Sequence, residues 1–234
     1  MAGERRACTA PRRIPLSTPE TDGEALRPHD LLWIRDPEDI RSISEVPAWA
    51  SREWLSLAPG VVRREAVAER DMAPVGLRGR ARSERFAAYV AREGIRRRVT
   101  PEALAQARAW CGNSALASLP CVRALSRVAP ELDRLRLTWG ITGSVGFALA
   151  SGVSTLRQDS DLDLLLRAER PLSREAARAL FALLQAAPAH IDMQIDTGRG
   201  GFALAEWAGQ ADRVLLKTGR GPLLVADPWA ADGS

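Results

Sequence analysis

The chain has 234 residues, of which 46% are hydrophobic and 26% charged, and a formal net charge of +4. These values are ordinary for a globular protein with a buried core. The weak positive charge and the 5% aromatic content argue against nucleic-acid binding, and no apolar run approaches the roughly 18 residues of a membrane span. Three cysteines without metal-ligand spacing, and no apolar segment typical of a secretory signal, indicate a cytoplasmic protein.

The first half of the chain predicts a tail and a small module. Residues 1–25 are rich in Pro, Thr, Arg and Ala without an apolar period, so we expect a disordered tail. Residues 31–34 form the first compact apolar run, and residues 61–64 and 75–79 give two further predicted strands. His29 and Asp30 precede the first strand, where we expect an exposed turn or strand start or, alternatively, a ligand contact. Residues 26–115 are therefore predicted to form a small N-terminal α/β or β module.

Arg78, Arg82 and Arg85 form a basic stripe, with the last two in a helix-like stretch predicted to end near Glu93. Such a stripe is commonly a solvated face. The alternative is that these arginines bind the anionic part of a nucleotide, because a planar guanidinium matches phosphate oxygens.

A helical section follows the module. Thr100 and Pro101 are typical of a helix start, and the helix is predicted to end near residue 110. Pro120 and Pro130 predict further short helices. This section joins the module to a catalytic domain predicted over residues 116–234.

Two acids stand two residues apart at the start of an apolar run over residues 161–166. The pattern predicts a strand on which Asp161 and Asp163 point to one face while Leu162 and Leu164 point into the core. Carboxylates this close repel each other unless a cation lies between them, and Mg²⁺ prefers carboxylate oxygens. The segment therefore predicts a magnesium site, with Mn²⁺ as the alternative metal.

Two other segments carry groups suited to phosphate chemistry. Gly143 and Ser144 precede a predicted helix over residues 144–150, where exposed backbone N–H groups suit a phosphate. Asp192 lies on a predicted strand over residues 190–195 and is the third acid of the predicted site. Asp196 is the alternative third acid, and we prefer Asp192 because Asp196 leads directly into a turn.

Lys217 is the only lysine among 33 basic residues and ends an apolar run. It has two interpretations, a compact ammonium held against a phosphate or a single solvated lysine. The segment around it predicts a closing pair of strands over residues 213–217 and 222–225. A helix over residues 173–184 joins the two acidic strands.

The order of Gly143-Ser144, Asp161-x-Asp163 and Asp192 resembles the active-site signature of the nucleotidyltransferase superfamily that includes polymerase β. More narrowly, the chain resembles the malonate decarboxylase holo-acyl-carrier-protein synthases, also called phosphoribosyl-dephospho-CoA transferases. The closer resemblance extends from about residue 26 to about residue 225. It is carried by residues 27–34, 61–64, 74–79 with Arg82 and Arg85, 159–165 and 214–218.

The resemblance implies an α+β fold with a polymerase-β-like mixed sheet and a smaller N-terminal module. The implied donor is 2'-(5''-triphosphoribosyl)-3'-dephospho-CoA, and the acceptor is a serine of the apo acyl carrier protein of malonate decarboxylase. A phosphodiester would form and diphosphate would leave. The implied catalytic and metal-binding residues are Asp161, Asp163 and Asp192, and the implied substrate-binding residues are Gly143, Ser144, Lys217, Arg78 and Arg82.

Two alternatives stay open at the level of sequence. One is a nucleotidyltransferase that acts on another small molecule or protein. The other is a catalytically inactive module that binds a carrier protein, although such a protein would tend to lose the three acids that this sequence keeps.

Overall fold

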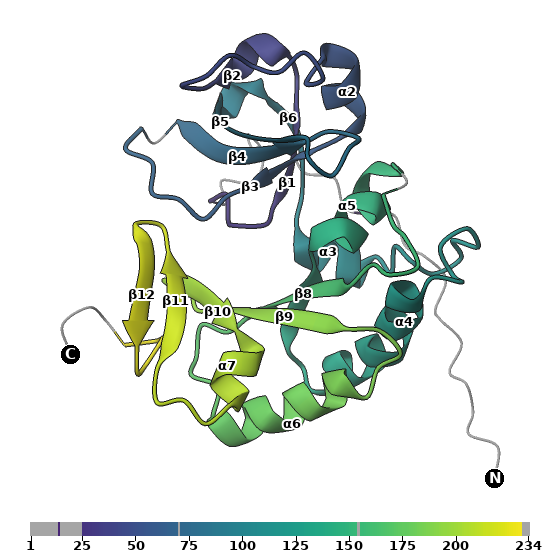
Figure 1. Cartoon of the computed structure of the whole chain (residues 1–234), viewed down its shortest axis with the longest axis vertical. Coiled ribbons are helices and arrows are strands. Elements are labelled where there is room, and N and C mark those ends of the chain that lie inside the picture. The colour runs from purple at the N-terminus through teal and green to yellow at the C-terminus, as the bar shows by residue number, and fades with distance from the viewer. Residues whose placement is uncertain (1–13, 15–24, 70, 154, 231–234) are drawn as a thin grey trace.

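A computed structural model of the whole chain describes residues 14, 25–69, 71–153 and 155–230. Two lobes lie one above the other in Figure 1, and each is built on a six-stranded sheet. The tail predicted over residues 1–25 lies almost entirely outside the described residues. Each helix in the described part of the chain is too short or too polar to traverse a bilayer.

The N-terminal lobe is an antiparallel sheet with the strand order β2-β5-β4-β3-β1-β6. Its elements are β1 (Leu31–Ile34), β2 (Ile40–Arg41), α2 (Arg52–Leu57), β3 (Gly60–Val62), β4 (Met72–Arg78), β5 (Arg85–Ala91) and β6 (Ile95–Val99), with single 3-10 turns at Pro37–Asp39 and Arg92–Gly94. The three strands predicted in this lobe are confirmed.

The helix-like stretch predicted through Arg82 and Arg85 is wrong. Arg85 begins β5, which pairs with β4 over seven residues and places Arg78 opposite Arg85. Along β5 the buried residues are Ala88 and Val90, a period of two that belongs to a strand. Residues 79–84 form the connecting turn, where the Glu84 carboxylate accepts the backbone N–H of Ala81 at 2.8 Å.

The C-terminal lobe is a mixed sheet with the order β12-β11-β10-β9-β8-β7. Only β8 and β9 are parallel, and α6 connects them. The strands are β7 (Thr138–Ile141), β8 (Leu162–Arg167), β9 (Ile191–Asp196), β10 (Gly200–Ala203), β11 (Val214–Thr218) and β12 (Gly221–Val225); the helices are α3 (Pro101–Gln106), α4 (Pro120–Arg134), α5 (Gly143–Ser151), α6 (Arg174–Gln185) and α7 (Leu204–Ala208). Helices packed on mixed strands confirm the α+β class.

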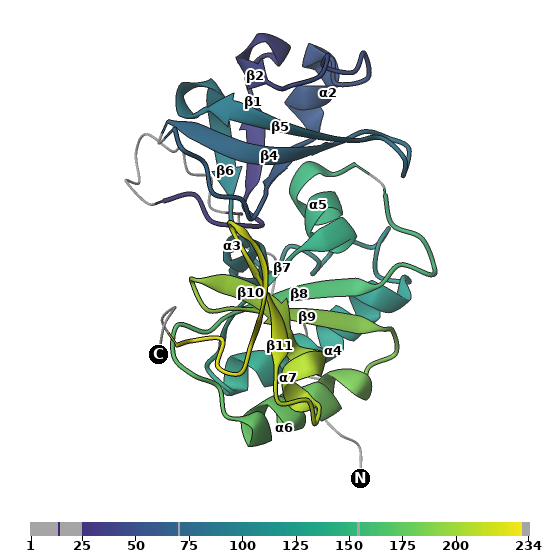
Figure 2. The same cartoon turned by 60° about the vertical axis from the view of Figure 1, so that its left-hand side comes forward.

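The two faces of the C-terminal sheet have different neighbours. Leu162, Leu164 and Leu166 of β8 lie in the main core cluster, on the side covered by α4, α6 and α7 (Figures 1 and 2). The opposite face carries Asp163 and Arg167, and it is turned toward α3, α5 and the N-terminal lobe. The alternation predicted for Asp161–Leu164 is thus confirmed on β8.

Two helical predictions need adjustment. The hydroxyl of Thr100 accepts the N–H of Ala103 as predicted for a helix start, but α3 already ends at Gln106. Pro130 starts no new helix, because it lies inside the 15-residue α4. The N–H that a proline lacks would have bonded the carbonyl of Ser126, which is an exposed residue. The predicted boundary at residue 115 places α3 in the N-terminal module. In the structure α3 packs against β7 and α5.

A buried ion-pair network joins the two lobes. Arg167 donates from Nε to Glu102 at 2.7 Å, from Nη1 to Asp196 at 2.5 Å and from Nη2 to the carbonyl of Pro28 at 3.0 Å. Arg64 of the N-terminal lobe also donates to Asp196, at 2.9 Å. Because every member is partly or fully buried, this interlobe network holds the lobes in one relative orientation.

The prediction of an exposed turn at Asp30 is wrong. Asp30 is fully buried, and its carboxylate accepts a 2.9 Å hydrogen bond from Nε of Arg98, which is also buried. Burial raises the pKa of Asp30, while the N–H of Arg27 and the charge of Arg98 act against this rise. The counter-charge comes from a residue 68 positions away, which no local pattern reveals.

Candidate active site

Three carboxylates meet at one edge of the C-terminal sheet. Asp161 is exposed immediately before β8, and Asp163 is half-buried on β8. The parallel register places Asp192 of β9 directly opposite Asp163. Asp192 is 67% exposed and lies 3.2 Å from His190, measured between its Oδ1 and the imidazole Nε2. The sheet therefore assembles the acids that the sequence predicted for the metal site.

The charge on Asp163 is disfavoured where it lies. Burial raises the pKa of Asp163, and the negative charges of Asp192 and Asp161 raise it further, against a smaller opposing effect of His190. No described basic side chain forms an ion pair with Asp161 or Asp163. Such a group of acids has a negative potential that a cation would relieve.

Gly143 is a glycine for a reason specific to this site. Its φ is +59°, a left-handed value that glycine adopts without strain, and a Cβ atom there would overlap Oδ2 of Asp163. The N–H of Thr142 donates to the backbone carbonyl of Asp163 at 3.0 Å, which fixes the start of α5 beside β8. Ser144 lies in the first turn of this helix, as predicted. The helix N-terminus therefore lies in contact with the acidic strand.

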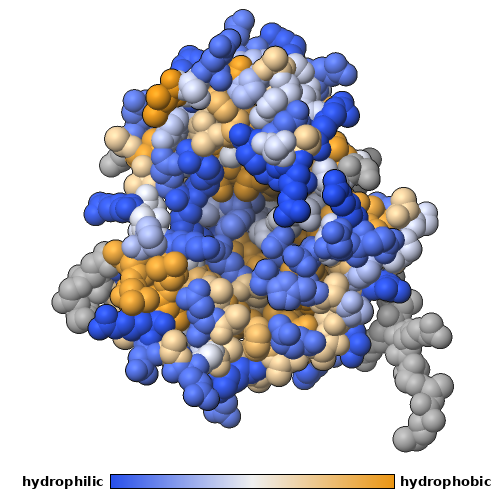
Figure 3. Space-filling model, in the orientation of Figure 1, coloured by the Kyte–Doolittle hydropathy of each residue, from blue (hydrophilic) through white to orange (hydrophobic). Residues whose placement is uncertain are grey.

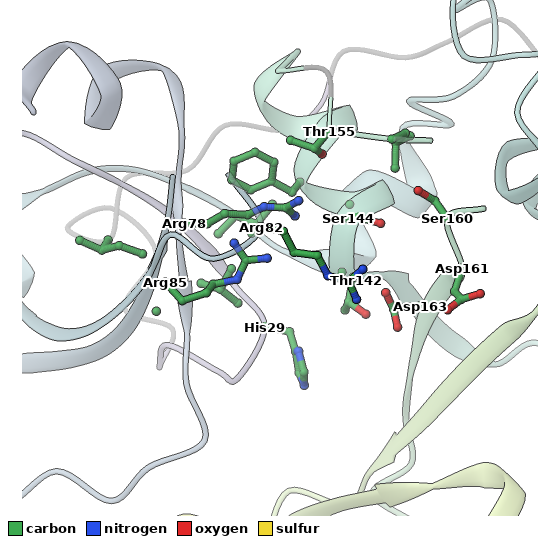
Figure 4. Close-up of a pocket in the computed structure, with 18 of the residues that line it drawn as sticks. His29, Arg78, Arg82, Arg85, Thr142, Ser144, Thr155, Ser160, Asp161 and Asp163 are labelled. Atoms are coloured by element: carbon green, nitrogen blue, oxygen red, sulfur yellow. The ribbon is translucent and has the colours of Figure 1, made fainter. Parts of the chain in front are cut away.

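A cleft of about 940 Å³ runs between the lobes beside this edge. Hydrophilic side chains gather around the hollow between the lobes in Figure 3. In Figure 4, Ser144, Asp161 and Asp163 lie on one side, while Arg78 and Arg82 of the N-terminal lobe extend toward them from the other. The cleft thus brings together six of the predicted site residues: Gly143, Ser144, Asp161, Asp163, Arg78 and Arg82.

Asp196 has a different role from Asp161, Asp163 and Asp192. It is 3% exposed, and its carboxylate is occupied by Arg64, Arg167 and the N–H of Gly198. Burial alone would raise the pKa of Asp196, but the hydrogen bonds from Arg64 and Gly198 and the charge of Arg167 hold it below its usual range. This carboxylate is part of the interlobe network and is not free to bind a ligand.

Lys217 is not brought into the cleft. It pairs with Gly201 across β10 and β11, and Gly201 pairs with Asp196 on β9. Three strand spacings and four residues along β9 then separate Lys217 from Asp163, which amounts to about 20 Å. Lys217 is exposed at that position.

Thr155 and Ser160 line the cleft and were not predicted as site residues; they come from the loop between α5 and β8. Arg85, for which a nucleotide contact was the alternative prediction, lines the cleft from the mispredicted strand. His29 also lines the cleft and lies 2.6 Å from Gln194, measured between Nε2 and Oε1. Burial lowers the pKa of His29, which favours the neutral form of its imidazole. Its positive φ of 76° is unusual for histidine, but the sequence contains no signal of that conformation.

The chain matches two family descriptions over most of its length. Residues 27–101 match the phosphoribosyl-dephospho-CoA transferase MdcG N-terminal domain, and residues 103–228 match the corresponding MdcG C-terminal domain. The junction between the two matches falls in α3, between the two sheets. No solved structure matches the chain significantly.

Relatives named phosphoribosyl-dephospho-CoA transferase cover nearly the same residues. One from Pseudomonas putida (strain W619) is 48% identical over 205 residues, which are 88% of this chain and 96% of that protein. One from Pseudomonas syringae pv. tomato is 45% identical over 202 residues, 86% of this chain and 92% of that protein. One from Azotobacter vinelandii is 44% identical over 207 residues, which are 87% of this chain and 94% of that protein.

Together with these relatives, the two-lobed α+β fold and its charged cleft identify the chain as a transferase enzyme. The chain belongs to the phosphoribosyl-dephospho-CoA transferase family, as the sequence resemblance implied.

Proposed function

We propose that this enzyme transfers the phosphoribosyl-dephospho-CoA group of 2'-(5''-triphosphoribosyl)-3'-dephospho-CoA to a serine of the apo acyl carrier protein of malonate decarboxylase, in the cytoplasm. The name shared by the relatives supports the transferred group. The observation that carries the chemistry is the contact between Asp163 and the start of α5, inside a cleft whose other wall bears arginines. That arrangement suits a substrate with several phosphates.

The order of elements supports a polymerase-β-like catalytic lobe as part of this proposal. The α5 helix follows β7 and presents Gly143 and Ser144, β8 presents Asp163 with Asp161 at its start, and the parallel β9 presents Asp192. This is the order that the resemblance to the nucleotidyltransferase superfamily implies.

The acids suit Mg²⁺, with Mn²⁺ as the alternative. Among the described residues, no three His, Cys, Asp or Glu side chains are arranged to hold a metal by themselves. Mg²⁺ commonly takes one or two carboxylates and completes its shell with water and substrate phosphates, so Asp161 and Asp163 with Asp192 nearby fit it. When bound, the metal would neutralise charge on the reacting phosphate and on the leaving diphosphate.

The residues of the cleft then have distinct roles. The serine Oγ forms a bond to the α-phosphorus, while the bond from that phosphorus to the bridging oxygen of the diphosphate breaks. The serine proton passes to Asp192, whose exposed carboxylate can reach a side chain on another protein. The N–H groups at the start of α5 and the Ser144 hydroxyl hold phosphate oxygens. Lys217 has no part in this step because of its distance.

The test is the intact mass of apo carrier protein after incubation with the enzyme, Mg²⁺ and the donor. We expect a mass gain equal to the donor less diphosphate. The Asp161→Asn variant should give no gain, and Asp212→Asn, which changes an exposed acid outside the cleft, should behave as the wild type.

The alternative substrates are tested in the same preparation. A folded enzyme that leaves the carrier protein unmodified but binds Mg²⁺ and labels another target from ATP would contradict the proposed donor and acceptor. Transfer by a fully folded Asp161→Asn variant would contradict the proposed acidic site.

A further inference from the structure

Three arginines form a group on the wall of the cleft that belongs to the N-terminal lobe. Arg78 ends β4 and Arg85 begins β5 directly opposite, while Arg82 lies in the turn between them. Figure 4 shows all three extending from the N-terminal lobe toward the side of the cleft that carries Asp161 and Asp163. Charges of both signs therefore line one cleft.

These arginines have no acidic partner among the described residues. The nearest acid in the turn, Glu84, is engaged with the backbone of Ala81, and Arg85 reaches only the carbonyl of Glu84, at 3.2 Å. The Nε atom of Arg78 is buried without a hydrogen-bond partner. Burial lowers the pKa of Arg78, and the like charges of Arg85 and Arg82 lower it further. An anion would satisfy this group, as acids satisfy the arginines of the interlobe network.

Arg78 is also held in place by its neighbours. The Arg78 guanidinium lies 5.1 Å from the centre of the Phe147 ring on α5, and the Arg78 carbonyl accepts the indole N–H of Trp54 at 2.7 Å. The backbone of Arg85 is paired in the β4–β5 ladder, while the side chains of Arg82 and Arg85 are exposed to the cleft. A charged side chain that is held in place before the ligand arrives loses less entropy on binding.

We infer that Arg78, Arg82 and Arg85 bind the diphosphate bridge of the dephospho-CoA part of the donor, an inference that rests on the proposed function. A triphosphoribosyl-dephospho-CoA carries two separate anionic groups, the triphosphate and the diphosphate between adenosine and pantetheine. The carboxylate edge repels a phosphate unless a divalent cation intervenes, whereas arginines bind one directly.

The size of the cleft agrees with a donor whose two anionic groups bind at different walls. Small-molecule pockets measure about 300–1,000 Å³, and the cleft of about 940 Å³ lies at the upper end of that range. It therefore has room for an extended nucleotide with one anionic group at each wall. Binding of a phosphate group at the arginine wall should be independent of divalent cations, whereas binding at the acid edge should require them.

The test is calorimetric titration of the full-length enzyme with dephospho-CoA in the presence of EDTA. Dephospho-CoA contains the diphosphate bridge and lacks the triphosphate. We expect the wild type to bind it, and Arg82→Ala and Arg85→Ala each to bind it at least about 10-fold more weakly, since each removes charge-assisted hydrogen bonds. Arg78→Lys keeps the positive charge but lacks the planar guanidinium, so its affinity for dephospho-CoA should lie between those of the wild type and the alanine variants.

Three controls separate the arginine wall from other effects. Arg127→Ala changes an exposed arginine of α4 outside the cleft and should bind dephospho-CoA as the wild type does. Asp163→Asn should bind it at least as well as the wild type in EDTA. Adenosine and pantetheine, which lack the diphosphate, should not distinguish Arg82→Ala from the wild type.

The inference is overturned if wild-type binding of dephospho-CoA requires Mg²⁺, if Asp163→Asn weakens binding as much as Arg82→Ala does, or if both alanine variants bind normally. Transfer to the carrier protein is measured with the same preparations. Transfer with unaltered dephospho-CoA binding in the arginine variants would leave the proposed function standing and remove this subsite. If the variants lose dephospho-CoA binding but the wild type transfers nothing to the carrier protein, the subsite stands and the proposed function is contradicted.

Discussion

Replacement of Asp196 by Asn should destabilise the enzyme strongly without removing a catalytic group. The carboxylate is 3% exposed and accepts hydrogen bonds from Arg64 at 2.9 Å, from Arg167 at 2.5 Å and from the N–H of Gly198 at 2.8 Å. Asparagine leaves two guanidinium groups beside a neutral amide. Removing one member of a buried ion pair costs about 3–5 kcal/mol, because the remaining charge is left uncompensated.

The expected fall in Tm follows from this free energy. For a chain of 150–250 residues, 1 kcal/mol shifts Tm by about 2–4 °C, so Asp196→Asn should melt about 6–20 °C below the wild type. Asp192→Asn is the matched comparison, because it changes a carboxylate that is 67% exposed on the same strand. Its free energy of unfolding should stay within about 0.5 kcal/mol of wild type, while transfer is lost. Calorimetric melting and the mass assay below the lower Tm measure both effects.

The pH dependence gives an independent readout of the same pair. The pKa of Asp196 is lowered in the folded enzyme, so its contribution to stability is complete above the unfolded value of about 3.9 and is lost as pH falls through the folded value. The difference in Tm between wild type and Asp196→Asn should therefore shrink below about pH 4. An Asp196→Asn variant with wild-type Tm and no transfer would refute the reasoning and make Asp196 the third catalytic acid.

Three further predictions concern the cleft and the lysine. Gly143→Ala should reduce transfer about 100-fold or more, because the added Cβ displaces Asp163. Gly152→Ala is the matched control, because Gly152 also has a positive φ, of +73°, but a Cβ there meets no atom within 4 Å. It should lower stability by about 1 kcal/mol and retain activity. Asp163→Asn should raise Tm by about 1–4 °C, because it removes a negative charge directly opposite Asp192. Mg²⁺ should raise the Tm of the wild type but not that of the variant. Thermal melting with Mg²⁺ and with EDTA measures both effects. Lys217→Ala should keep the transfer rate at saturating donor within about twofold of wild type, and a tenfold loss would contradict the separation worked out above.

The sequence predicted the acidic edge of the site because its signals are local. The strand of Asp161 and Asp163 begins an apolar run of period two, and the buried partners Leu162 and Leu164 confirm that period. Gly143 was predicted from its place before a helix. The structure adds a reason that no pattern contains, since only a residue without a Cβ allows Asp163 to approach the start of α5.

The arginine wall and the interlobe network depend on contacts that are distant in the chain. Arg85 was predicted to lie with Arg82 in a helix-like stretch, but pairing with β4 decides the conformation. His29 and Gln194 are 165 residues apart, and Arg64 and Asp196 are 132 residues apart. Propensity and spacing describe only near neighbours, so such partners follow from the packing of the lobes.

The separation of charge across the cleft explains why the enzyme carries a buried ion-pair network away from its reacting groups. Asp161 and Asp163 belong to the C-terminal lobe and Arg78, Arg82 and Arg85 to the N-terminal lobe, so opposite charges attract each other across the cleft. Arg64, Arg167 and Asp196 join the two lobes through separate ion pairs that lie outside the cleft. Buried ion pairs add little net stability compared with apolar packing, but they define a single geometry because each alternative leaves a charge unpaired. The network therefore keeps both walls of the cleft charged and available for a substrate that carries anionic groups at two points.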